Sequence, residues 1–113
     1  MTFHKDIPYL EHILDAIKDM EDSTESLSKS DFIKNKDVRD ANVRRLEIIG
    51  EAVKNISEEI KRKYPNIEWK KIAATRDKII HHYFGIDFGI IWNIIIKDIP
   101  LLKEKIQNIK KKL

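Results

Sequence analysis

Apolar residues recur at three- and four-residue steps along most of the chain, a spacing that places them on one face of an α-helix. The first such stripe follows Asp6 and consists of Ile7, Leu10, Ile13, Leu14, Ile17 and Met20. Pro8 fits the first turn of a helix, where its missing N–H costs nothing. The pattern therefore predicts a first helix from about Ile7, followed by turn and capping residues from Ser28 to Asp31.

A second stripe lies between Val38 and Tyr64, after a short helical turn at Phe32 and Ile33. It consists of Val43, Leu46, Ile49, Val53, Ile56 and Ile60. Gly50 lies inside this predicted helix, where glycine costs about 1 kcal/mol relative to alanine. The simplest explanation is the close approach of another backbone, which would place Gly50 and Glu51 at a helix crossing or at a site.

The rest of the chain predicts further helices in an antiparallel bundle. Pro65 ends the second helix, and Asn66 is a candidate N-cap for a third that reaches Tyr83. Residues 88–96 are apolar almost all round, so this helix must be buried, within the fold or between subunits. Pro100 is expected to kink or restart the chain before a last amphipathic helix. We therefore predict an all-α, single-domain bundle of four to five helices over residues 1–113.

Composition sets limits on the class of protein. The chain has 113 residues, enough for one hydrophobic core, and its 22 Lys and Arg against 19 Asp and Glu give a net charge of +3. This small excess permits an anionic partner without requiring one. The absence of cysteine excludes disulfides, and we see no signal sequence and no apolar run of membrane-spanning length. We expect a cytoplasmic protein with no membrane partner.

Two metal sites that helical bundles often hold are not supported by the sequence. No Glu is followed by His three residues later, and no His-Glu-x-x-His occurs. The adjacent His81 and His82 would point about 100° apart on a helix and could not easily bind one ion together. We expect neither a metal nor a cofactor.

Reactive side chains are concentrated between Arg76 and Tyr83. Asp77 and His81 are four residues apart, so on a helix the carboxylate could orient the imidazole and raise its basicity. Arg76 and His81 point about 140° apart on a straight helix, so their cooperation needs a distorted helix or a second copy of the chain. A structural interpretation stays open: Arg76 forms a surface ion pair, His81 caps carbonyls and Tyr83 packs in the core.

The pattern Arg76-x-x-x-x-His81-x-Tyr83 resembles the Arg-x4–6-His motif, extended to His-x-Tyr, of HEPN domains in the HepT-like (DUF86) family. The segment from Asn42 to Ala52 is similar to that family's Gly-Glu helix, and residues 65–69 resemble its Pro-x-Ile-x-Trp approach. The order and separation of these features also agree from Leu10 to Leu102. One departure is Asp77, where the family often has Asn.

The resemblance implies a toxin that cuts RNA without a metal and is paired with a minimal nucleotidyltransferase antitoxin. Arg76 would bind phosphate and His81 would act as general acid–base in a homodimer, with Glu51 and Asp77 in accessory roles. Tyr83 would be the tyrosine that the antitoxin modifies with AMP, and the dimer could assemble further with that antitoxin. The alternative is a non-catalytic HEPN module that serves as the binding or nucleotide-sensing partner of a nucleotidyltransferase.

Overall fold

The chain is helical along almost all of its described length. The structure is a computed structural model that describes residues 5–81 and 85–113, without the side chains of residues 80 and 81. Its elements are α1 (Ile7–Thr24), α2 (Lys29–Lys34), α3 (Lys36–Asn55), α4 (Glu58–Lys63), α5 (Trp69–His81), α6 (Phe88–Asn93), the π-helical turn η2 (Ile94–Asp98) and α7 (Ile99–Lys111). No strand occurs in the described ranges, so the predicted all-α class is confirmed.

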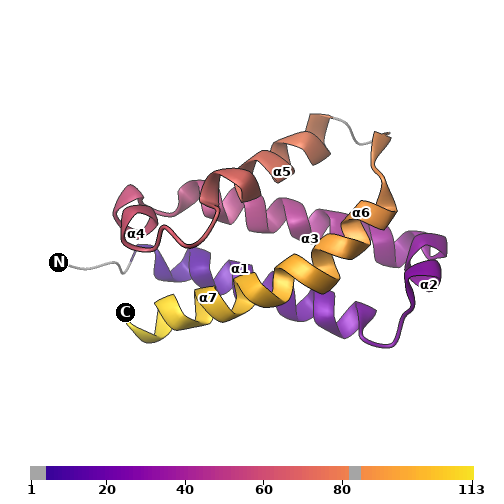
Figure 1. The fold of residues 1–113 in the computed structure, drawn as a ribbon, viewed down its shortest axis with the longest axis horizontal. Helices are drawn as coiled ribbons and strands as arrows, with labels where there is room; N and C mark the ends of the chain where they lie inside the picture. Colours follow the sequence, from indigo (N-terminus) through magenta and orange to yellow (C-terminus); the bar gives the residue numbers. More distant parts are fainter. Residues whose placement is uncertain (1–4, 82–84) are drawn as a thin grey trace.

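The long helices lie side by side and alternate in direction (Figure 1). α1 packs against α3 and α7, and α3 also packs against α5. α6, η2 and α7 follow one another without a break and return as one long helix to the end of the bundle where α1 begins. The predicted antiparallel bundle is therefore confirmed, with α3 between α1 and α5.

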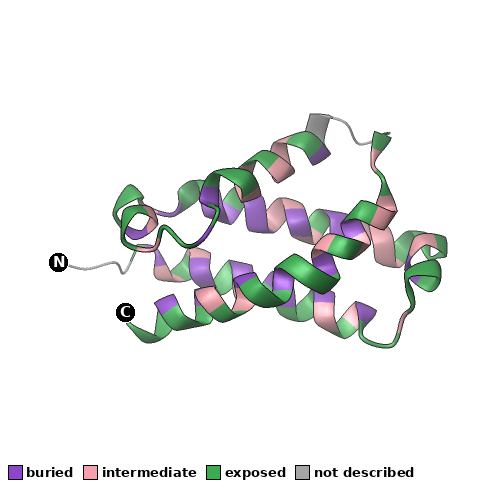
Figure 2. Cartoon of the chain, viewed as in Figure 1, coloured by how far each residue is buried: buried purple, intermediate pink, exposed green. Residues whose placement is uncertain are grey.

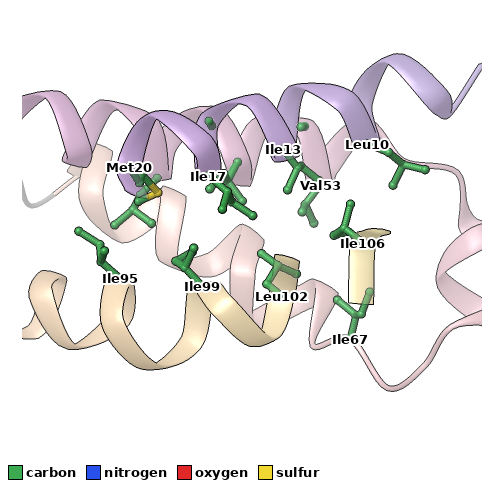
Figure 3. Packing of buried hydrophobic residues seen from close by; sticks show 14 of the residues in the cluster. Leu10, Ile13, Ile17, Met20, Val53, Ile67, Ile95, Ile99, Leu102 and Ile106 are labelled. Carbon is green, nitrogen blue, oxygen red and sulfur yellow. The ribbon is translucent and has the colours of Figure 1, made fainter. Parts of the chain in front are cut away.

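The predicted apolar stripes form the core. Buried residues lie on the inner faces of the long helices, while their outer faces are exposed (Figure 2). In Figure 3, side chains of α1 face those of the last helix across the interior. The labelled core residues are Leu10, Ile13, Ile17, Met20, Val53, Ile67, Ile95, Ile99, Leu102 and Ile106.

The predicted second helix is wrong beyond Asn55, because the chain breaks there into α3 and the short α4. The side chain of Ser57 caps α4 by accepting a hydrogen bond from the Ile60 N–H at 3.3 Å. The buried Asp6 carboxylate in turn accepts bonds from the Ser57 N–H at 2.8 Å and the Ser57 hydroxyl at 2.7 Å. These bonds hold the corner between α3 and α4 against the start of α1.

Local capping accounts for the shorter helices. Ser28 and Asp31 form a capping box: the Ser28 hydroxyl oxygen accepts from the Asp31 N–H and the Asp31 carboxylate accepts from the Ser28 N–H. This confirms the capping chemistry predicted there. The expected cap at Asn66 is wrong, because α5 begins at Trp69 after a turn in which the Trp69 indole N–H donates to the Tyr64 carbonyl oxygen at 3.0 Å.

The restart expected at Pro100 is found: α7 begins at Ile99, with Pro100 in its first turn, directly after the π turn η2. Proline has no N–H, and its ring would clash with the carbonyl four residues earlier in a regular α-helix. The wider turn η2 precedes it, and the Ile99 N–H donates to the Ile94 carbonyl oxygen five residues back.

With α6, η2 and α7 taken as one continuous helix, the described chain has six separate helical segments, more than the four to five predicted, because α2 and α4 are helices of their own.

The isoleucine-rich helix is buried on one side only. Ile91, Ile95 and Ile99 lie in the core, whereas Ile90 is 58% and Ile96 is 48% exposed. Of the two predicted modes of burial, burial within the fold therefore holds for one side of the helix only, and burial between subunits stays a prediction for the exposed side. Among the described helices, none combines the length and apolar character needed to cross a membrane.

Candidate functional site

α3 and α5 cross at Gly50, directly beneath Arg76. A Cβ atom built on Gly50 would lie 2.2 Å from the Arg76 Cβ and 2.8 Å from its Cγ, closer than any real contact. Glycine is therefore required for the stem of Arg76 to lie against α3. The prediction that Gly50 allows a close approach at a helix crossing is confirmed.

The Arg76 guanidinium is held by two carboxylates from different helices. Its Nη2 lies 3.0 Å from the Glu51 Oε2 on α3, and its Nη1 lies 3.3 Å from the Asp77 Oδ1 on α5. The Arg76 side chain is half-buried at 27% exposure, whereas that of Glu51 is 55% exposed. Such contacts fix the plane of the guanidinium at the surface, where its remaining N–H groups can meet an anion.

Lys54 completes this group of charges, and sequence reasoning did not find it. Its Nζ lies 2.6 Å from the same Asp77 oxygen that contacts Arg76. The Lys54 hydrogen bond, assisted by Arg76, holds the pKa of the Asp77 carboxyl below its ordinary value of 3.8. Asp77 is thus an anion between two cations, and its negative charge is locally balanced.

The structure brings together Glu51, Arg76 and Asp77, three of the five residues predicted to form the site. Asp77 was expected to orient His81, but the partners described for its carboxylate are Lys54 and Arg76. His81 is the last residue of α5, and its side chain lies outside the described part of the chain, as does the whole of Tyr83. Their predicted roles stay predictions.

A hollow of about 180 Å³ opens beside Arg76, between α1 and α3. Its lining combines apolar side chains with aromatic, cationic and anionic ones. The residues are Tyr9, His12, Arg44, Glu47, Ile48, Glu51, Ala52, Asn55 and Arg76. Sequence periodicity alone could have placed Tyr9 and His12 on α1, but not opposite the polar side of α3.

The side chains at this crossing are suited to binding an anion. Within residues 5–81 and 85–113, no three His, Cys, Asp or Glu side chains are grouped so that they could hold a metal ion. Arginine fixed by carboxylates is suited to bind a phosphate in a set orientation. The crossing of α3 and α5 thus presents a cation at the surface, next to a hollow.

These features define a small helical-bundle protein with an arginine-centred polar site. The chain belongs to the Ribonuclease HepT-like family, whose family model matches residues 13–109. It is 45% identical over 108 residues to the "Probable ribonuclease HepT" of Thermococcus cleftensis, and the match covers 96% of each chain. It is 46% identical over 105 residues to a "Putative RNase" of Caldanaerobacter subterraneus subsp. tengcongensis, covering 93% of this chain and 94% of that relative.

A longer relative contains the same region beside other sequence. The "Gamma-glutamylcyclotransferase and putative RNase" of Methanocaldococcus jannaschii is 47% identical over 105 residues, which cover 93% of this chain. The match spans only 47% of that relative, so this chain corresponds to about half of it. No solved structure matches the chain.

Proposed function

We propose that this protein is a metal-independent endoribonuclease in which Arg76 binds the scissile phosphate and His81 transfers protons. A base takes the proton of the ribose 2′-OH, whose oxygen attacks the adjacent phosphorus. The P–O5′ bond then breaks, and the departing 5′-oxygen receives a proton, leaving a 2′,3′-cyclic phosphate and a 5′-OH end. Histidine titrates near neutral pH and suits both proton transfers.

The observation that carries this proposal is the fixed guanidinium at the crossing of α3 and α5. Glu51 and Asp77 hold Arg76 from two sides at 3.0 and 3.3 Å. A guanidinium has five N–H donors, so these contacts leave donors for a phosphate oxygen. Cations held in place before the reaction stabilise the negative charge that develops on the phosphorane. Family membership and the names of the relatives support the same activity.

The proposed enzyme is a homodimer whose cleft lies between two copies of the site. Arg76 and His81 are five residues apart on α5 and so point about 140° apart on a regular helix. A second copy could bring its own His81 to the phosphate that Arg76 binds. The exposed Ile90, Ile96 and Leu101 offer apolar surface for such an association.

The proposed biological role is that of the toxin in a toxin–antitoxin pair. A minimal nucleotidyltransferase antitoxin would transfer AMP to Tyr83, two residues beyond His81 in the sequence. The added phosphate would bring negative charge and bulk close to the cleft and repel RNA. The toxin dimer could associate further with this antitoxin.

A second candidate is a non-catalytic module that binds or senses nucleotides for a nucleotidyltransferase. The pairing of Arg76 with two carboxylates favours the absence of cleavage in this candidate, because Glu51 and Asp77 reduce the positive charge that would stabilise the transition state. Lys54 weakens the argument for this second candidate, because it balances the negative charge of Asp77 beside Arg76.

Cleavage of RNA by the purified protein in the presence of a chelator tests the proposal. We expect wild-type protein to cut and His81→Ala to be slower by about 100-fold or more. Arg62→Ala on the exposed surface of α4 is the matched control and should cut like wild type. Equal cutting by His81→Ala, or cutting that requires a divalent cation, would reject the mechanism. Intact mass after coexpression with a nucleotidyltransferase, compared with Tyr83→Phe, tests the modification.

A further inference from the structure

The hollow beside Arg76 has the composition of a binding site for a flat ring. Ile48 and Ala52 form an apolar part of its lining, and Tyr9 stands on the opposite helix. The His12 ring meets the Tyr9 ring edge-on, at 6.1 Å between centroids and 90° between planes. Aromatic side chains of this kind stack on nucleobases without reading their sequence. At about 180 Å³ the hollow is smaller than the roughly 300 Å³ at which pockets for drug-sized ligands begin, so it suits one ring system.

The charges around the hollow favour a base over a second phosphate. Arg44 and Arg76 balance the two carboxylates of Glu47 and Glu51 in the lining, so the hollow has no excess of positive charge for a second phosphate. The carboxylates can accept hydrogen bonds from the N–H groups of a neutral base. Glu51 is already paired with Arg76 at 3.0 Å. The described partner of Glu47 is Arg44, whose Nη1 lies 3.6 Å from the Glu47 Oε2, and the Glu47 side chain is 22% exposed. Glu47 is therefore the carboxylate available to a ligand.

The position of Arg76 connects this hollow to the proposed cleavage site. Arg76 lines the hollow and is also the residue proposed to bind the scissile phosphate. A nucleotide whose phosphate lies on Arg76 has its own or the adjoining base within reach of the neighbouring surface. Among the RNA bases, guanine presents two adjacent N–H donors on one edge, which is the arrangement that a carboxylate binds with two parallel bonds.

We infer that the hollow between α1 and α3 holds a guanine base next to the scissile phosphate, with Tyr9 as the stacking surface and Glu47 as the acceptor of its N–H groups. This inference rests on the proposed ribonuclease function and adds a substrate preference to it. It assigns specificity to residues outside the segment from Arg76 to Tyr83. The same contacts would hold guanine-containing RNA even in a protein that cuts slowly.

Cleavage of short RNAs that differ only in the bases flanking one cleavage position tests the inference. We expect wild-type protein to prefer guanine on one side by about tenfold or more, and Glu47→Gln to lose this preference, since the amide cannot accept both N–H groups. Tyr9→Ala should raise KM about tenfold with little change in kcat, whereas Tyr9→Phe keeps the ring and should resemble wild type. Glu59→Gln, on the exposed surface of α4, is the matched control.

A binding measurement separates failure of the subsite from failure of the proposed function. RNAs with a 2′-deoxy sugar at the cleavage position cannot be cut, and their affinities report binding alone. If wild type cuts no RNA, the proposed function fails, and weaker binding of guanine-containing RNA by Glu47→Gln still supports the subsite. The inference is overturned if Glu47→Gln and Tyr9→Ala leave affinity and base preference unchanged. It is also overturned if Tyr9→Ala dissociates a dimer, because the hollow would then belong to a subunit contact.

Discussion

Gly50 and Arg76 occupy complementary positions on two crossing helices: the missing side chain of one leaves the space that the stem of the other fills. A Cβ atom on Gly50 would lie 2.2 Å from the Arg76 Cβ. Interiors are packed too densely to absorb such an overlap without a shift of the helices. The orientation of the arginine therefore depends on a residue that makes no polar contact itself.

Gly50→Ala should destabilise the protein and misplace Arg76. The overlap of the new Cβ with Arg76 should destabilise the fold by about 1–3 kcal/mol, and the better helix propensity of alanine should offset about 1 kcal/mol of this. We expect Tm to fall by roughly 5 °C and RNA cleavage to fall more than stability explains. Gly85→Ala is the control, because a Cβ there has no described atom within 4 Å. Wild-type stability and activity of Gly50→Ala would contradict the required close approach.

Arg76→Lys should retain the positive charge and lose its orientation. Lysine carries a point charge and cannot reproduce the planar set of donors that reaches Glu51 and Asp77 together. We expect kcat for RNA cleavage to fall about 100-fold, in the range measured when one donor to a developing oxyanion is removed. Arg62→Lys is the matched substitution at an exposed position. If Arg76→Lys has a kcat close to wild type, the planar guanidinium is not required for cleavage.

Lys54→Met should raise the pKa of Asp77 toward its ordinary value. The Lys54 hydrogen bond is the main cause of the lowered pKa, ahead of the Arg76 hydrogen bond. Carboxyl NMR signals measured against pH should show this shift, while Lys70→Met on the exposed surface should leave the Asp77 titration unchanged. If the pKa of Asp77 is the same in Lys54→Met as in wild type, the ion pair does not persist in solution.

The lowered pKa of Asp77 also predicts how stability depends on pH. Folding favours the ionised carboxyl, so its stabilisation is fully present above the unfolded pKa, near 3.8, and is lost as pH falls through the lower folded value. Wild type should therefore be more stable than Asp77→Asn at pH 7, and the difference should vanish in strong acid. Urea unfolding at several pH values measures it. A difference that grows on acidification would have the wrong sign.

Asp6→Ala should destabilise the corner between α3 and α4. The substitution removes both acceptors of Ser57, whose N–H and hydroxyl are bonded at 2.8 and 2.7 Å. A typical intramolecular hydrogen bond contributes about 0.5–1.5 kcal/mol, and Ser57 is only partly buried, so the free energy of unfolding should fall by about 1–3 kcal/mol for the two bonds. Asp19→Ala, exposed on α1, is the control. Equal urea midpoints for the two variants would show that the corner is held by other contacts.

The hydrophobic pattern predicted the long helices because their buried faces have few interruptions. It failed at the break before Ser57, since Val53, Ile56 and Ile60 keep helical spacing across it. Ser57 followed by Glu58 and Glu59 is a recognisable helix start, and this capping signal could have revealed α4. A stripe reports which face is buried, whereas capping residues report where a helix ends.

The site was predicted in part for a similar reason. Gly50 and the adjacent Glu51 marked the crossing, helical spacing to His81 singled out Asp77, and the resemblance to HEPN domains supplied the role of Arg76. Lys54 was missed because its bond to Asp77 joins residues 23 positions apart, and only the crossing of α3 and α5 brings them together. The hollow depends in the same way on how α1 lies against α3.

The π turn before Pro100 changes the angular position of α6 side chains relative to those of α7 around the last helix. In a regular α-helix each four-residue step drifts by about 40°, so Ile91 would sit about 80° around from Ile99. The extra residue in η2 corrects this drift and keeps Ile91, Ile95 and Ile99 on the core side. The π turn thus accommodates one more residue than a regular α-helical turn. α7 can therefore pack against α1 while α6 packs against α2 at the opposite end of the bundle.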